Sequence, residues 1–148
     1  MRTISLTTAE AVALVRRAKK ETAGVTCEAA VHHFILTEQA VEGYNTYAKM
    51  SPPLRTEKDI DALRKGMKDG TIDCIVTDHA PHSEEEKEIG FENAPFGVIG
   101  FETALPLAFT LADHGFTPSE IVSLLTAGPA RVMGLERGVV AEGRRADL

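Results

Sequence analysis

The stretch that decides the fold is residues 72–82, IDCIVTDHAPH. Residues 72–77 are apolar apart from Asp73 and the terminal threonine, and a short run of this kind is typical of a strand buried on both faces of a parallel sheet. The strand leads directly into Asp78, with His79 and His82 close behind. Barrel enzymes place their reactive groups at this end of a parallel strand. An aspartate is also a common turn residue, so position alone leaves both interpretations open.

Outward from this strand, the sequence predicts alternating strands and helices. Two further strands are expected at residues 2–6 and 25–31. Three helices are expected to begin at capping threonines: Thr7 (in a capping box with Glu10), Thr56 and Thr117. Further helices are expected at residues 101–114 and from Gly128. Such alternation predicts an α/β fold with parallel strands and right-handed helical crossovers. Three strands fit either an open sheet or the last part of a (β/α)8 barrel.

Composition narrows the functional classes. The 148 residues predict one domain, and the formal charge of −6 gives no basic face for nucleic acid or an anionic membrane. No segment approaches the ~18 apolar residues of a membrane span. Cys27 and Cys74 lie far apart in apolar runs, which favours buried free thiols over a disulfide. We therefore predict a cytoplasmic protein without a nucleic acid or membrane partner, and a small-molecule substrate is implied only by the resemblance described next.

Four motifs in order then carry a resemblance. They are VTCEAAVHHFILT at 25–37, YAKMSPPLR at 47–55, CIVTDHAPHSEEEK at 74–87 and NAPFGVIGFETALPL at 93–107. Together they resemble the C-terminal part of dihydroorotases, in the cyclic amidohydrolase superfamily. The resemblance implies that residues 1–134 are the C-terminal portion of a (β/α)8 TIM-type barrel. It also implies that residues 135–148 begin the return to a small β domain, and residues 138–148 predict a hairpin that ends within a strand.

The resemblance further implies a zinc hydrolase that opens and closes the ring linking dihydroorotate and N-carbamoyl-aspartate. Asp78 matches the aspartate that contacts the metal and transfers protons, so it is the expected catalytic and metal-binding residue. His82, Phe96 and Gly97 match substrate-binding positions, as does Ser51, which stands where the family has asparagine. Without the resemblance, a plain turn with a packed aromatic is the simpler interpretation of residues 95–97.

The sequence also departs from the family. The sixth-strand motif His-Val-Ser-Thr reads Ser-Leu-Thr-Thr at residues 5–8, and serine is a poor zinc ligand. The other metal-binding motifs precede any residue present here, while Val31 replaces the proline before the paired histidines. A catalytic zinc site normally has about three protein ligands. We therefore expect that this chain alone neither binds zinc tightly nor turns over dihydroorotate. It is expected to self-associate, to pair with a separately encoded, complementing N-terminal half, or to be a truncated product.

Two other functions remain open. One is a related cyclic amidohydrolase, such as a hydantoinase or an allantoinase, from which His82 distinguishes a dihydroorotase. The other is a non-catalytic homologue that acts as a scaffold. His32 and His33 are adjacent on a predicted strand, so we expect one of them to point inward with a hydrogen bond rather than a metal-binding pair. His114 is expected to cap a helix end, and residues 84–86, three glutamates, are expected to be a solvated charge run.

Overall fold

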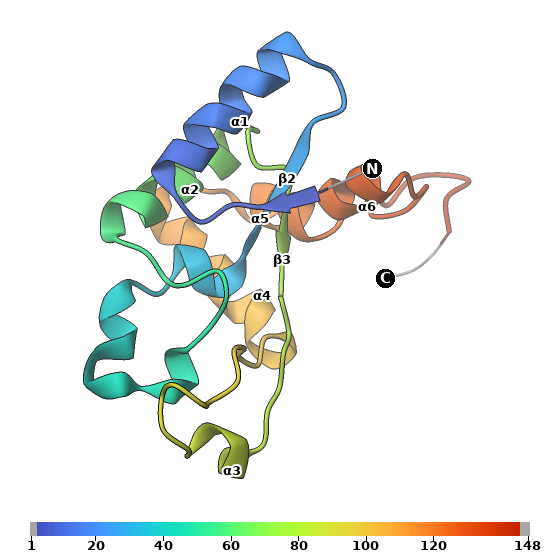
Figure 1. The fold of residues 1–148 in the computed structure, drawn as a ribbon. Coiled ribbons are helices and arrows are strands. Elements are labelled where there is room, and N and C mark those ends of the chain that lie inside the picture. Colours follow the sequence, from blue (N-terminus) through green and yellow to red (C-terminus); the bar gives the residue numbers. More distant parts are fainter. Residues whose placement is uncertain (1–2, 146–148) are drawn as a thin grey trace.

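The computed structural model describes residues 3–145, which form a three-stranded parallel sheet covered by helices (Figure 1). The strands are β1 (Thr3–Ser5), β2 (Thr26–Ala30) and β3 (Cys74–Val76), in the order β1-β2-β3. Ile4 lies opposite Cys27, and Ala29 lies opposite Ile75. The predicted α/β fold with parallel strands is therefore confirmed.

Helices fill the connections between and after the strands. The α-helices are α1 (Ala9–Glu21), α2 (Glu57–Lys68), α3 (Glu84–Lys87), α4 (Phe101–Phe109), α5 (Pro118–Leu125) and α6 (Ala127–Met133). Short 3-10 helices are η1 (Val31–Phe34), η2 (Glu38–Tyr44), η3 (Thr46–Ala48) and η4 (Thr110–His114). No helix among residues 3–145 is long and apolar enough to cross a bilayer.

One apolar core lies between the sheet and helices α1, α2, α4 and α5. Val12, Leu63, Ala108 and Ile121 reach it from these four helices in turn, and each is at most 1% exposed. Amphipathic helices bury such a stripe because transfer of apolar surface out of water is favourable. The two cysteines are buried and free, as the sequence predicted.

Helix capping follows the sequence at two of three predicted places. Thr56 and Thr117 each form a capping box, with Asp59 and Glu120 as partners. The predicted cap at Thr7 is wrong. Thr7 is buried, and the cap of α1 is Thr8, whose hydroxyl accepts from the Ala11 amide at 3.2 Å.

The reason for this shift is a contact between two helix N-termini. The Asp59 carboxylate of α2 accepts from the Ala9 amide at 2.8 Å, which satisfies another free donor at the start of α1. Glu10, the predicted partner of Thr7, is exposed. Asp59, which is 50 positions from Ala9, thus supplies the carboxylate at the start of α1 that the sequence spacing had assigned to Glu10.

Three other elements differ from the sequence prediction. The strand predicted at 25–31 ends at Ala30, and the paired histidines lie in η1. The helix predicted from Phe101 to His114 is α-helical to Phe109, with Pro106 inside it, and continues to His114 as the 3-10 helix η4. Residues 135–145 form turns and no strand, while residues 146–148 of the predicted hairpin lie outside the described residues.

Candidate functional site

Asp78 lies two residues beyond the carboxyl end of β3. Its carboxylate is 55% exposed, and its φ of 47° places it in the left-handed region that a non-glycine residue rarely adopts. The nearest ionisable partner is His32, with Nε2 3.9 Å from Oδ2 of Asp78. This distance is too long for a hydrogen bond. The carboxylate is therefore presented at the strand end and is free to meet a ligand.

The paired histidines lie beside Asp78, and both are buried. His33 Nε2 lies 2.9 Å from the carbonyl oxygen of Pro52 and donates to it, whereas His32 Nε2 has no hydrogen-bond partner among residues 3–145. Burial and the neighbouring His33 lower the pKa of His32 to about 4, so its ring is neutral near neutral pH. His33 is thus the expected buried, hydrogen-bonded histidine, but His32 is buried as well, because the chain has left the strand and strand alternation no longer applies.

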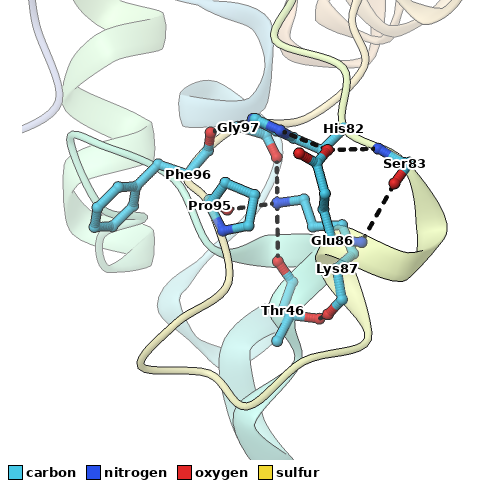
Figure 2. Close-up of polar contacts among 8 residues, drawn as sticks. All are labelled: Thr46, His82, Ser83, Glu86, Lys87, Pro95, Phe96 and Gly97. Carbon is cyan, nitrogen blue, oxygen red and sulfur yellow. Dashed lines mark hydrogen bonds and ion pairs between the residues drawn. The ribbon is translucent and has the colours of Figure 1, made fainter.

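A second group of site residues meets on the loop that follows. His82 Nε2 lies 3.0 Å from the carbonyl oxygen of Phe96, and His82 Nδ1 lies 3.4 Å from a carboxylate oxygen of Glu86 (Figure 2). Both ring nitrogens therefore face acceptors, and only the imidazolium form donates to both. An anion that binds His82 must take the place of one of these acceptors, and Glu86 holds the longer contact.

Gly97 allows a close approach of two backbones. Its φ is 130°, and an added Cβ would lie 2.6 Å from the Ala80 Cβ and 2.7 Å from the Ala80 carbonyl oxygen. The Gly97 amide donates to the Lys49 carbonyl at 3.0 Å. Glycine is required here because the loop packs against Ala80, which lies between Asp78 and His82 in the chain. A cavity of about 300 Å³ opens beside Ala80, His82 and Gly97.

Ser51 lies in a segment that connects the two groups. Lys49, before it, bonds Gly97 through the backbone, and Pro52, after it, accepts from His33. Ser51 itself is exposed, and so is Phe96, at 56%. Asp78 and His82 thus lie on one segment that hydrogen bonds join to the Phe96–Gly97 segment, and Gly97 in turn bonds the segment that carries Ser51.

Three side chains that shape this region were not predicted. Lys49 and Lys87 are buried and donate hydrogen bonds to carbonyl oxygens of neighbouring segments, and the Lys49 ammonium also lies 4.7 Å from the centroid of the Phe96 ring. His79 Nδ1 accepts from the Gly100 and Phe101 amides at 2.9 and 3.3 Å, so this histidine caps α4. Its ring stacks on Phe101 with centroids 4.2 Å apart. No fixed spacing along the sequence links these side chains to their distant backbone partners, so no sequence pattern predicted the hydrogen bonds.

The predicted solvated charge run is correct only in part. Glu84 and Glu85 are exposed, but Glu86 accepts from the Ser83 amide at 3.0 Å and completes a capping box for α3. The same carboxylate faces His82. Glu86 therefore orders both the start of α3 and the imidazole ring of His82.

The described residues could supply one ligand to a metal ion, but not a complete metal site. Within residues 3–145 no cluster of at least three His, Cys, Asp or Glu side chains could hold a metal ion. Ser5, which aligns with the family's sixth-strand histidine, donates its hydroxyl to Glu28 at 2.8 Å. Asp78 alone is too few ligands for a catalytic zinc site, which has about three from protein. No catalytic step through zinc can be derived for these residues by themselves.

The chain is similar to known proteins over almost its whole length. The dihydroorotase of Endomicrobium trichonymphae is 51% identical over 146 residues, which are 97% of this chain and 35% of that protein. The dihydroorotase of Pelobacter propionicus is 49% identical over 97% of this chain and 34% of its own length. The solved L-hydantoinase (dihydropyrimidinase) of Arthrobacter aurescens is 26% identical, with a TM-score of 0.87 over 97% of this chain and 34% of that structure.

The chain therefore spans about a third of the length of the curated relatives it matches. Its partial parallel sheet corresponds to the same share of the TIM-barrel hydantoinases. The amidohydrolase family matches residues 3–148, almost the whole chain. This match over more than half of the sequence shows that the chain belongs to the amidohydrolase family.

Proposed function

We propose that this chain supplies the C-terminal part of a dihydroorotase-type hydrolase of cyclic amides. The observation that carries the proposal is the exposed Asp78 carboxylate at the end of β3, on the same segment as His82. The identity of 51% to a dihydroorotase supports the substrate class. In this proposal dihydroorotate and N-carbamoyl-aspartate are the ring-closed and ring-opened forms, as the sequence motifs implied.

Asp78 is the residue to which we assign proton transfer. As a base it takes the proton of the attacking water, and as an acid it returns that proton to the departing ring nitrogen. We assign the substrate carboxylate to His82, whose imidazolium form would donate to it in place of Glu86. The Phe96–Gly97 backbone and Ser51 complete the proposed substrate contacts. Zinc, with Asp78 as one ligand, would polarise the amide and lower the pKa of bound water.

The remaining ligands require more of the barrel than this chain contains. In the described sheet β1 and β3 are the outer strands, and each has one side without a strand partner within residues 3–145. Such edges pair readily with another chain. We propose a complementing N-terminal part of an amidohydrolase as the partner, with self-association as the alternative. A β domain beginning at residues 135–148 and a cytoplasmic location belong to the same proposal.

Complementation tests the function. The chain is mixed with zinc and the N-terminal two-thirds of the Endomicrobium trichonymphae dihydroorotase, and hydrolysis of dihydroorotate is followed by absorbance. We expect turnover only when both chains are present, and a loss of about 100-fold or more for Asp78→Asn. Undiminished turnover by Asp78→Asn would rule out the role assigned to this carboxylate.

A hydantoinase is the second candidate, supported by the 26% identity to an L-hydantoinase of the same fold. The complemented protein is therefore also assayed with hydantoin, which carries no carboxylate. His82→Asn should raise KM for dihydroorotate about 10-fold or more and leave KM for hydantoin nearly unchanged if His82 binds the carboxylate. Preference for hydantoin would favour the second candidate, and stable assembly without turnover of either substrate would favour a scaffold.

A further inference from the structure

The most unusual group outside the proposed reacting residues is the ammonium of Lys87. This residue ends α3 and is only 4% exposed, although lysine is rarely buried without a partner. Its Nζ donates to the carbonyl oxygens of Thr46 at 3.2 Å, Pro95 at 2.9 Å and Gly97 at 2.7 Å (Figure 2). An ammonium has three N–H donors, so the three carbonyls use all of them.

The three acceptors come from two segments far apart in the sequence. Thr46 precedes the segment that carries Ser51, and its hydroxyl donates in return to the Lys87 carbonyl at 2.5 Å. Pro95 and Gly97 flank Phe96, whose own carbonyl is the acceptor of His82. Fixing the carbonyls on both sides of Phe96 leaves the Phe96 carbonyl little freedom to turn. Lys87 therefore controls an atom that it does not touch.

A second buried lysine, Lys49, contacts the same loop from a segment that lies far before it in the sequence. Lys49 Nζ donates to the carbonyls of Phe91 at 2.6 Å, Glu92 at 3.2 Å and Ala94 at 2.7 Å. Burial and the positive charge of Lys49 lower the pKa of Lys87. The two positive charges repel each other. If either side chain served only to fill space here, an apolar residue would be more stable at its position. Both ammonium groups donate to backbone carbonyls within residues 88–97, and these hydrogen bonds order the loop.

We propose that Lys87 is a positioning residue for the substrate end of the site: its ammonium fixes the Pro95–Gly97 backbone and so holds His82 in place for an anionic substrate. The proposal rests on the proposed function for the identity of that substrate. Its structural half, the ordering of residues 88–97 and of the His82 ring, stands independently of turnover.

The test compares Lys87→Met with Lys68→Met as a matched control. Lys68 is also an ammonium bonded to a carbonyl, that of Gly115, but it lies outside the loop and pairs with Glu120. Amide hydrogen exchange is measured on the 148-residue chain. We expect Lys87→Met to speed exchange in residues 88–97 about 10-fold or more, to leave the amides of α2 unchanged and to shift the ¹⁵N signals of the His82 ring. Lys68→Met should change neither loop nor ring.

Two further measurements complete the test. In the unmodified chain, the Lys87 ammonium should give a distinct, slowly exchanging ¹⁵N signal, and this reading stands even if Lys87→Met fails to fold. In the complemented enzyme, Lys87→Met should raise KM for dihydroorotate about 10-fold while kcat changes less, and Lys87→Arg should recover part of that loss. An unprotected ammonium, or unchanged loop exchange in the variant, overturns the proposal. If the unmodified pair is inactive, the proposed function fails, while the exchange and ring signals still decide the structural half.

Discussion

The helix-covered core and the 88–97 loop are held in different ways. In the core, side chains such as Leu63 and Ile121 are fully buried among other apolar groups. In the loop, Lys49 and Lys87 hold the backbone by ammonium–carbonyl hydrogen bonds. Apolar burial is strong but non-directional, whereas charge-assisted hydrogen bonds fix individual atoms. The difference indicates that the core gives the protein its stability and that the loop gives the proposed site its geometry.

The largest effect is expected from breaking the core. Leu63→Ala leaves a cavity where a side chain is 0% exposed, so it should lower the free energy of unfolding by about 2–5 kcal/mol. Leu14→Ala, at a position that is 57% exposed on α1, is the matched control and should change it little. Urea unfolding followed by circular dichroism measures both. Equal losses in the two variants would show that the core is not packed as described.

A smaller, local effect is expected in the loop. Gly97→Ala combines a strained φ with contacts below 3 Å to Ala80, so it should displace the loop at a cost of about 1–3 kcal/mol. Gly90→Ala is the control, because no atom lies within 4 Å of its added Cβ. Limited proteolysis should cut the first variant faster within residues 88–97 and spare its helices. Cutting throughout the Gly97→Ala chain would mean that loop and core are one cooperative unit.

A lysine that pairs with a carboxylate, as Lys68 does with Glu120, should make the stability depend on pH, whereas a lysine bonded to backbone carbonyls should not do so in the acid range. The side-chain bond from Lys68, and then the bonds from Thr117, lower the pKa of Glu120 to about 2. A lowered carboxyl pKa contributes stability above its unfolded value of about 4.3, and this contribution is lost as the pH falls towards 2. Glu120→Gln should therefore flatten the decline of the urea midpoint between pH 4.5 and 2, as read from midpoints at several pH values. A profile parallel to that of the unmodified chain would contradict the assignment.

The smallest effect is expected for the two cysteines, whose thiols should hardly react with a thiol reagent in the folded chain. Burial raises the pKa of the Cys27 and Cys74 thiols to about 11, and a buried neutral thiol is a poor nucleophile. At pH 8 the folded chain should react with a thiol reagent far more slowly than the chain in urea. Mass spectrometry of the labelled protein provides the measurement. Rapid labelling of either cysteine in the folded chain would mean that the sheet opens readily.

The sequence predicted those parts of the site that depend on local order. Asp78 follows an apolar strand, so the order of residues predicted its place at a strand end, while its catalytic role came only from the resemblance. The capping boxes at Thr56 and Thr117 were predictable because both partners lie within one turn of the chain. The cap of α1 was not, because Asp59 reaches Ala9 from another helix.

Sequence by itself therefore determined the order of strands and helices, the apolar faces that build the core, and the position of Asp78. Periodicity and capping act between residues a few positions apart, so a single chain of letters records them. Only the tertiary structure decided that Lys49 and Lys87 are buried, that His79 caps α4 and that His82 meets the Phe96 carbonyl. Their partners are backbone carbonyls and amides, which every residue carries, and only folding selects which of them come within hydrogen-bonding distance.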